Sequence, residues 1–491
     1  MNLLEIQGDA RCEMGDEGIL ERHYFNCQRP EFLVYLPMFF NHKRRNIVRK
    51  FSIYLILVLF SLSLVGCAKA KEESGKTVVQ MWVMPNSLEP IADIEKLLKG
   101  FEAENPGIKV KVTSVDWGAA WTKITTAATS GDVPDLVQIG STWVGSISGM
   151  GSLMDIKDKV SELGGKNAFV PAAWRSAGLE GSGQVTAIPW FMDARAMFYR
   201  TDVLREAGVD PKELGDWRSF EKALKKIKDA KVSIDGLEIS PLGISGKNDW
   251  NVIHNLAPWI WGAGGDFIGT DRKQAVINSK DSLKGILYYI GLVKSGYVPI
   301  EYLELNTAQV SSNFNNGSCA IYFDGPYEVK TLTTPPGQGG AAGSLTSRNF
   351  AVAPYPAGQK GKVTFVGGSN LGIFKLAKHP NEAFKVIQYL TSKKVQVDYA
   401  KVTGFLPARR DAFDDPFFSS DPNRRIFKEA VLYGKTYPCI PAWGLLEPVL
   451  TRRFGIMWEY VTNTFENGYK ESEIKKQLDL AKSEIDGVLK Q

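Results

Sequence analysis

The feature that most restricts how this chain folds is a regular alternation of apolar strands and amphipathic helices that begins at Thr77. Strand, helix, strand, helix and strand are expected in turn over residues 77–83, 90–104, 108–112, 121–128 and 136–139. The first helix carries apolar side chains at helical spacing, and the second strand alternates valine or isoleucine with lysine. This order is the βαβ rhythm of a parallel sheet covered by helices, so the first half is predicted to be α/β and doubly wound.

The second half becomes richer in helices after Ala187-Ile188-Pro189-Trp190. Apolar residues at helical spacing predict helices over 219–230, 282–294, 380–391 and 471–490, and an apolar stretch predicts a strand or crossing segment over 350–354. The Gly- and Pro-rich residues 335–343 predict a surface loop.

An export signal precedes the folded part. Basic residues from Lys43 to Lys50 are followed by the apolar stretch 51–65, which is too short to cross a bilayer with ease. The residues Leu64-Val65-Gly66-Cys67 resemble the lipobox of bacterial lipoproteins, whose cysteine is diacylated after the signal is cut away. We expect residues 38–66 to be a lipoprotein signal peptide and Cys67 to anchor the chain to the outer face of the cell membrane. The alternative is that Cys67 is an ordinary small residue ending a hydrophobic segment.

The segments on either side of this signal differ in character. Residues 67–76 are polar and aperiodic, which predicts a flexible tether between lipid and folded body. Residues 1–37 form a mixed-charge extension that does not fit an export signal, so we expect translation to start at Met38 and the extension to be misannotated.

Composition excludes several classes of protein. The 59 basic and 54 acidic residues nearly balance, so no nucleic-acid partner is expected. Cys319 and Cys439 are the cysteines left after the signal, and we expect two separate buried thiols without a metal site. Phosphate loops, dinucleotide fingerprints, nucleophile elbows and His-Glu-x-x-His are absent from the sequence, so neither a cofactor nor enzymatic activity is predicted.

Aromatic residues stand beside polar ones in several segments that we expect to be loops. Sugars demand this mixture, because a ring face of C–H groups stacks on an aromatic surface while the hydroxyls need bidentate polar partners. The segments are Asp116-Trp117, Ser141-Thr142-Trp143, residues 190–195, Asp249-Trp250-Asn251, Trp259-Ile260-Trp261, residues 324–328, and Ala442-Trp443-Gly444 with Glu447. Core packing is the expected role for Trp82, Trp121, Trp174, Trp217 and Trp458, whereas a binding role is favoured for Trp143, Tyr327 and Trp443.

Four motifs together resemble the extracellular solute-binding proteins of ABC importers, in the group that includes maltose-binding protein. They occur in family order over nearly all of the chain after the signal. They are residues 131–137 (GDVPDLV), Ile188-Pro189 with residues 198–204 (FYRTDVL), residues 323–327 (FDGPY), and residues 366–374 (VGGSNLGIF), which lead into the helix at Pro380.

The resemblance implies a two-lobed periplasmic-binding-protein-like fold of type II, with ligand in a cleft between α/β lobes. By analogy, hinge crossings lie near 193–196, 353–356 and 406–409. One lobe would comprise residues 77–193 and 356–405, and the other residues 194–355 and 406–491. Since Tyr327 stands where maltose-binding protein has tryptophan, the exact ligand is not carried over.

The resemblance also implies ligand contacts. Asp193 matches an acidic hinge residue that bonds sugar hydroxyls, and Tyr327 and Trp443 match aromatic platforms. Trp143 follows the third strand, where the first lobe supplies its contacts. Further candidates are Asp116, Trp117, Arg195, Trp250, Asn370 and Glu447.

The expected function is that of a monomeric receptor that binds a sugar or short oligosaccharide and delivers it to the permease of an ABC importer. Three alternatives stay open. A secreted carbohydrate-active enzyme would use two carboxylates, such as Asp193 and Glu447, across the scissile bond. The others are a binder of another solute class and a sensory lipoprotein.

Overall fold

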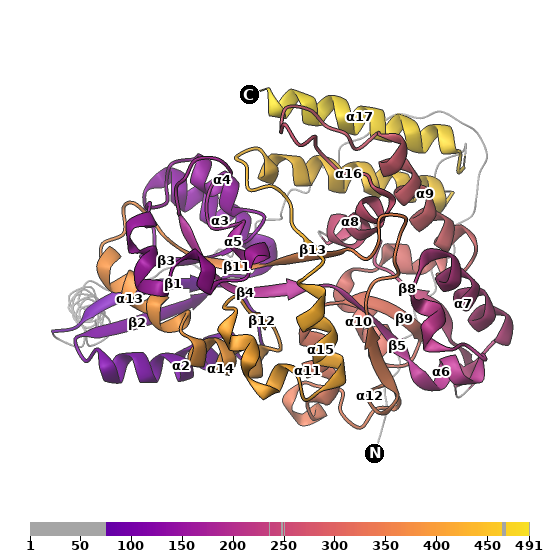
Figure 1. Cartoon of the computed structure of the whole chain (residues 1–491), viewed down its shortest axis with the longest axis horizontal. Helices are drawn as coiled ribbons and strands as arrows, with labels where there is room; N and C mark the ends of the chain where they lie inside the picture. The colour runs from indigo at the N-terminus through magenta and orange to yellow at the C-terminus, as the bar shows by residue number, and fades with distance from the viewer. Residues whose placement is uncertain (1–74, 235, 247–248, 250, 464–467, 491) are drawn as a thin grey trace, which may run out of the picture. The chain divides into compact units, whose positions relative to one another are not determined.

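The computed structural model describes residues 75–234, 236–246, 249, 251–463 and 468–490, and 75–491 form one compact unit. The expectations about the signal peptide, Cys67 and the start at Met38 therefore lie outside the described residues, as does Trp250. Two mixed sheets, each covered by helices, organise this unit (Figure 1).

The larger sheet has seven strands within the described residues, in the order β12-β4-β11-β3-β1-β2, with β13 beside β11. Its three parallel strands are the predicted ones, and β11 runs antiparallel to β3 and β4. The strands are β1 (Thr77–Val83), β2 (Ile108–Ser114), β3 (Leu136–Gly140), β4 (Ala187–Ala194), β11 (Thr364–Ile373), β12 (Leu406–Pro407) and β13 (Gly434–Lys435).

The helices on this sheet follow from local sequence signals. Helix α2 (Pro90–Glu104) has the predicted bounds and buries the predicted apolar face through Ile94, Leu98 and Phe101. Helix α3 (Trp117–Ser130) begins four residues before the predicted start, because the Asp116 side chain caps it by accepting a hydrogen bond from the N–H of Gly118. The other helices here are α4 (Val144–Gly149), α5 (Pro171–Trp174), α13 (Pro380–Leu390) and α14 (Lys393–Thr403).

The smaller sheet has four strands among the described residues, in the order β10-β5-β9-β8. They are β5 (Ala196–Arg200), β8 (Ser240–Gly243), β9 (Cys319–Asp324) and β10 (Phe350–Ala353), and β6 (Ser233–Ile234) pairs separately with β7 (Leu237–Glu238). The helices that follow these strands or pack near them include α6 (Thr201–Glu206), α7 (Trp217–Ala230), α9 (Lys280–Lys294), α10 (Thr307–Asn315), α11 (Tyr327–Thr333), α12 (Leu345–Arg348) and α15 (Pro422–Ala430).

The chain passes from the larger to the smaller sheet at one residue. Strand β4 ends at Ala194 and β5 begins at Ala196, so Arg195 alone separates a strand of one sheet from a strand of the other. This point lies inside the first expected crossing. Strand β12, at the third expected crossing, pairs with β4 in the larger sheet.

Several segments that we expected in loops belong to strands or helices, among them Trp117 in α3, residues 190–194 in β4, and Trp443-Gly444 at the start of α16 (Trp443–Val461). Residues 259–261, which we expected in a loop, belong to helix α8 (Val252–Ala263), and every side chain of this helix is buried. Apart from His254 and Asn255 the helix is apolar, and a helix of this kind lies inside the protein instead of showing one apolar and one polar face. Trp259 and Trp261 are therefore core residues, 1% and 4% exposed.

The C-terminal helices complete the fold. Helix α16 (Trp443–Val461) packs on α8, α9 and α17 (Glu471–Leu489), and its beginning reaches α4 beside the larger sheet. Cys319 and Cys439 are buried, free thiols. None of the helices in the described part is long and apolar enough to span a membrane.

Candidate functional site

A large open cavity of about 1430 Å³ brings together residues from both sheets. Its size exceeds the roughly 300–1,000 Å³ of ordinary small-molecule pockets. Two groups of side chains on its wall are of special interest. We call Asp193, Arg195, Asp324 and Tyr327 the polar floor, and Trp117, Trp121 and Trp143 the indole wall.

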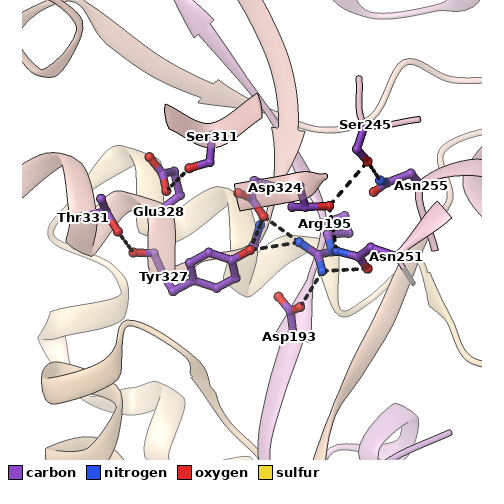
Figure 2. Close-up of polar contacts among 12 residues, drawn as sticks. Asp193, Arg195, Ser245, Asn251, Asn255, Ser311, Asp324, Tyr327, Glu328 and Thr331 are labelled. Carbon is purple, nitrogen blue, oxygen red and sulfur yellow. Dashed lines mark hydrogen bonds and ion pairs between the residues drawn. The ribbon is translucent and has the colours of Figure 1, made fainter. Parts of the chain in front are cut away.

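The polar floor is organised by one guanidinium between two carboxylates (Figure 2). Nη1 of Arg195 lies 2.6 Å from Oδ1 of Asp324, and Nη2 lies 3.3 Å from Oδ2 of Asp193. Nη2 also donates to Oδ1 of Asn251 at 3.3 Å. Because Arg195 is 4% exposed and Asp324 is fully buried, these contacts compensate charges that have lost most of their water.

The remaining member of the floor, Tyr327, is fixed from two sides. Its hydroxyl donates to Oδ1 of Asp324 and accepts a hydrogen bond from Nη1 of Arg195 at 3.3 Å. A side chain at Gly325 would come within 2.5 Å of both Asp193 and the Tyr327 ring, so glycine is required for this close approach. Asp324 ends β9 and Tyr327 begins α11, which places the motif at a strand-to-helix turn.

The carboxylates of the floor keep acceptor capacity. Oδ1 of Asp193 and Oδ2 of Asp324 have no hydrogen-bond partner among the described residues. Burial raises the pKa of Asp324 to about 6, against the opposing effect of Arg195, and it also raises the pKa of Asp193. Next to them, burial raises the pKa of Glu328 to about 8. The floor therefore combines strong acceptors with a fixed cationic donor.

His254, which also lines the cavity, is held as a neutral ring. Burial and the nearby Arg195 lower its pKa to about 3. The ring stacks on Phe365 with centroids 4.2 Å apart, and Nδ1 lies 2.9 Å from the hydroxyl of Tyr437. A general base for catalysis works best with a pKa near the operating pH, so His254 is poorly suited to that role.

The indole wall comes from two neighbouring segments of the larger sheet. Trp117 and Trp121 lie one turn apart in α3, and Trp143 precedes α4. The Trp143 ring lies 5.8 Å from each of the other two, tilted by 59° in both cases. All three pack against a small apolar cluster that includes Ile124, Val137, Ile139, Val144 and Cys439. The indole wall thus presents three apolar ring faces, and the small apolar cluster supports them.

Glu447, in the first part of α16, also lines the cavity. Its Oε1 accepts a hydrogen bond of 2.7 Å from the indole nitrogen of Trp443, one turn earlier in the helix. Burial raises the pKa of Glu447 to about 7, whereas Trp443, Thr142 and Trp143 lower it as hydrogen-bond donors.

The structure collects six of the ten predicted ligand-binding residues around the cavity. They are Trp117, Trp143, Asp193, Arg195, Tyr327 and Glu447. Three others lie elsewhere for clear reasons. Asp116 is an exposed helix cap, Asn370 is buried with its amide bonded to Ser176, and Trp443 is buried behind the wall, stacked on Tyr437 at 4.3 Å.

Sequence reasoning missed several cavity residues. Trp121 was expected in the core because it starts a helical apolar pattern, yet it is half-buried and lines the cavity. Asp324 is part of the quoted motif 323–327 (FDGPY). Its position directly before Gly325-Pro326 was the signal that could have identified it as a site residue. Asn251 stood in the quoted segment Asp249-Trp250-Asn251, although it was not chosen as a candidate, whereas His254 lies in helix α8, which was not predicted.

The chemistry of the site is that of recognition. No group of three His, Cys, Asp or Glu side chains suited to a metal ion occurs in the part of the chain that the structure describes. Apolar ring faces oppose a floor of buried hydrogen-bonding groups, an arrangement that fixes the orientation of a polar ligand with apolar faces.

Comparison with known proteins places the chain among binding proteins. Residues 96–426 match the family model described as bacterial extracellular solute-binding protein. The diacetylchitobiose binding protein DasA of Streptomyces coelicolor is 25% identical over 404 residues, which cover 79% of this chain and 88% of that protein. A maltooligosaccharide ABC transporter solute-binding lipoprotein of Streptococcus pneumoniae is 24% identical over 367 residues, 72% of this chain and 79% of that one.

The fold has close counterparts among solved structures. The sugar-binding protein MalE from Xanthomonas citri superposes with a TM-score of 0.68 at 24% identity, covering 84% of this chain and 98% of that one. This likeness confirms the predicted α/β, two-lobed periplasmic-binding-protein fold.

Proposed function

Because this chain belongs to the bacterial extracellular solute-binding proteins, we propose that it is a receptor for a short oligosaccharide, which it delivers to the permease of an ABC importer. The observation that carries the proposal is the indole wall and the polar floor in one cavity. The family consists of binding proteins, and we propose that this chain has no catalytic activity.

The two surfaces suit the two faces of a sugar. The C–H face of a pyranose ring would stack on Trp117, Trp121 or Trp143. Hydroxyl groups would donate to the Asp193 carboxylate, whose side chain is 13% exposed, and accept from Arg195, as charge-assisted hydrogen bonds, while the buried Asp324 holds Arg195 in place.

The size of the cavity favours more than one sugar ring. At about 1430 Å³ it is too wide for a monosaccharide to touch the floor and all three indoles together. Two relatives, DasA and the pneumococcal lipoprotein, are named for diacetylchitobiose and maltooligosaccharides, which are also short chains.

Ligand binding would draw the two sheets together. The indole wall lies on α3 and just after β3, next to the larger sheet. Asp324 ends β9 of the smaller sheet, and Tyr327 begins the helix that follows it. A ligand that contacts both gains affinity in the closed form, and its differential affinity shifts the equilibrium toward closure. The permease would recognise that closed form.

The decisive experiment is calorimetry with maltotriose, diacetylchitobiose and a galactooligosaccharide. We expect at least one to bind with a stoichiometry of one, and Asp193→Ala to weaken that binding by about tenfold or more. The matched control is Asp229→Ala, because Asp229 is exposed in an ion pair with Lys225 on α7.

The outcomes separate the alternatives. Absence of binding across the panel, or equal affinity in Asp193→Ala and Asp229→Ala, would refute the proposed site. Release of shorter sugars during incubation would instead support a carbohydrate-active enzyme.

We further propose that the protein is anchored through a diacylated Cys67 and acts as a monomer. Family membership supports an extracellular location, and the lipobox-like Leu64-Val65-Gly66-Cys67 supports the anchor. Cys67→Ser should leave the protein uncut and without lipid, measured by palmitate labelling and by the mass of the chain. Equal labelling of Cys67→Ser and wild type would contradict the anchor.

Copurification with permease subunits would distinguish an importer from a sensory lipoprotein.

A further inference from the structure

We propose that Thr307 is a positioning residue. Its hydroxyl, which is held by Asp249, orients the Asn251 amide, and that amide holds the Arg195 guanidinium in the polar floor. The effect of Thr307 on sugar affinity rests on the proposed function. Its effect on the guanidinium does not, and the two are tested separately below.

The argument starts from the partners of the Arg195 guanidinium. Nη1 is held by the buried Asp324 at 2.6 Å, whereas Nη2 has two partners, Oδ2 of Asp193 and Oδ1 of Asn251, each at 3.3 Å (Figure 2). Asp193 is the residue to which a sugar hydroxyl would donate. Asn251 is 2% exposed, so its amide can hold Nη2 in place while Asp193 serves the ligand.

The Asn251 amide can hold this cation only through its oxygen. The amide oxygen accepts hydrogen bonds, whereas the amide nitrogen donates them, so a reversed amide would place two donors against each other at Nη2. The nitrogen end is occupied by Thr307, because Nδ2 of Asn251 donates to Oγ1 of Thr307 at 3.3 Å. This bond leaves the oxygen end directed to Arg195.

The direction of the Thr307 hydroxyl is fixed in turn by Asp249. A hydroxyl both donates and accepts, so by itself it would not select one end of the amide. Asp249 is 4% exposed, and a carboxylate only accepts. The Thr307 hydroxyl donates to Oδ2 of Asp249, as does the N–H of Thr307 at 2.8 Å. With its proton engaged there, the Thr307 oxygen is left to accept from Asn251.

The other neighbours agree with this direction. Oγ of Ser245 lies 3.4 Å from Oγ1 of Thr307, and a serine hydroxyl can donate to it. Oδ1 of Asp249 accepts a hydrogen bond of 3.0 Å from the N–H of Asn251, so the same carboxylate also fixes the backbone that carries the amide.

The chain of hydrogen bonds joins two helices to the polar floor. Thr307 is the first residue of α10, which starts with a reciprocal cap between Asn306 and Gln309, and Asn251 directly precedes the buried helix α8. Two strand ends, at Asp193 and Asp324, support the guanidinium from its other side. The orientation of Arg195 is therefore set by residues that do not themselves carry the charge of the floor.

The first test measures rotation of the Arg195 guanidinium by NMR in the ligand-free protein. Its Nη signals are identified by their absence from the spectrum of Arg195→Lys. Thr307→Val keeps the size of the side chain but removes the hydroxyl, so rotation about the Nε–Cζ bond should become about tenfold faster, the effect of one lost hydrogen bond. Thr307→Ser keeps the hydroxyl and should restore slow rotation.

Thr391→Val is the matched control. Thr391 is 1% exposed, its hydroxyl donates to the carbonyl of Ile387 at 2.7 Å, and it is not among the residues that line the cavity. This change should leave the rotation of Arg195 and the affinity for sugar unaltered. If Thr307→Val does not fold by circular dichroism, Thr307→Ala takes its place, because it removes the same hydroxyl and adds no apolar group beside Asp249.

The affinity for maltotriose or diacetylchitobiose gives a second readout. Calorimetry should show a loss of about threefold to tenfold in Thr307→Val and recovery in Thr307→Ser. Weaker binding without faster rotation would indicate that Thr307 contacts the sugar directly, and it would overturn the positioning role. Faster rotation with unchanged affinity would overturn the part of the inference that concerns the ligand.

The results distinguish this inference from the proposed function. Unchanged rotation in a folded Thr307→Val or Thr307→Ala protein would overturn the positioning role, even if sugars bind. Faster rotation that Thr307→Ser does not reverse would overturn it too, since packing and not the hydroxyl would then be responsible. Faster rotation that Thr307→Ser reverses, without sugar binding to wild type, would support the positioning role and refute the receptor.

Discussion

At the residue scale, the polar floor depends on the charge of Arg195. Arg195 compensates two carboxylates, and Asp324 is fully buried. Removing one partner of a buried ion pair leaves a charge without compensation, whereas removing all partners at once costs much less.

Arg195→Met should therefore lower the free energy of unfolding by about 3–5 kcal/mol. The triple variant Arg195→Met, Asp193→Asn, Asp324→Asn should regain much of this loss, since its floor carries no net charge. Urea unfolding measures both. A loss below about 1 kcal/mol in the single variant would show that water compensates the carboxylates instead.

Glu447 gives stability a dependence on pH. Its pKa rises from 4.5 to about 7 on folding, chiefly through burial. Between these values the folded protein holds a proton that the unfolded chain has released, so the free energy of unfolding falls as pH rises. We expect Glu447 to contribute about 1–3 kcal/mol more stability near pH 5 than near pH 8.

The measurement compares wild type with Glu447→Gln by urea unfolding across that range. Asp324, Glu328 and His254 titrate in both proteins, so the difference between the two curves isolates Glu447. A difference that does not change with pH would contradict the raised pKa.

At the scale of elements, the contact between α4 and the residues around the start of α16 requires small residues. Gly145→Ala should lower the free energy of unfolding by about 1–3 kcal/mol, because its Cβ would overlap the backbone of Ile440. Gly487→Ala is the matched control, since Gly487 lies in α17 with no other atom within 4 Å of the added carbon. It should raise stability by about 0.5–1 kcal/mol, as alanine does in a helix. Equal effects of the two changes would refute the close packing.

Periodicity predicted the regular elements well. The bounds of α2 and the register of alternation in β2 follow from local apolar spacing, and both are confirmed. Helix α8 was missed because its residues are all buried and nearly all apolar, so its sequence shows no exposed polar face opposite an apolar one.

The candidate site was predictable where its residues stood in the quoted aromatic and polar segments, as Asp193, Arg195 and Tyr327 did. It was not predictable where tertiary contacts decide exposure. Trp121 and Trp443 stand in similar helical sequences, yet one lines the cavity and the other is buried behind it. Only the packing of α16 against α3 and α4 separates their roles.

At the scale of the whole molecule, ligand binding should be measurable as a gain in stability, and closure around the ligand as compaction. A sugar at about 100 times its Kd should stabilise the folded protein by about 2.7 kcal/mol, which raises the thermal midpoint. Small-angle scattering should show a smaller radius of gyration with ligand than without. A thermal shift without compaction would contradict closure while leaving binding intact.

Arg195 is the single residue between β4 and β5, and its guanidinium also holds the polar floor together through its ion pair with Asp324. An inserted residue here would displace the guanidinium from Asp324, so the length of this link is fixed. The segment 335–343 contributes Gln338, Gly339 and Gly340 to the cavity lining but no residue of the polar floor. Over evolutionary time, insertions and deletions that change ligand preference are therefore expected to accumulate in that segment, while the link keeps its length.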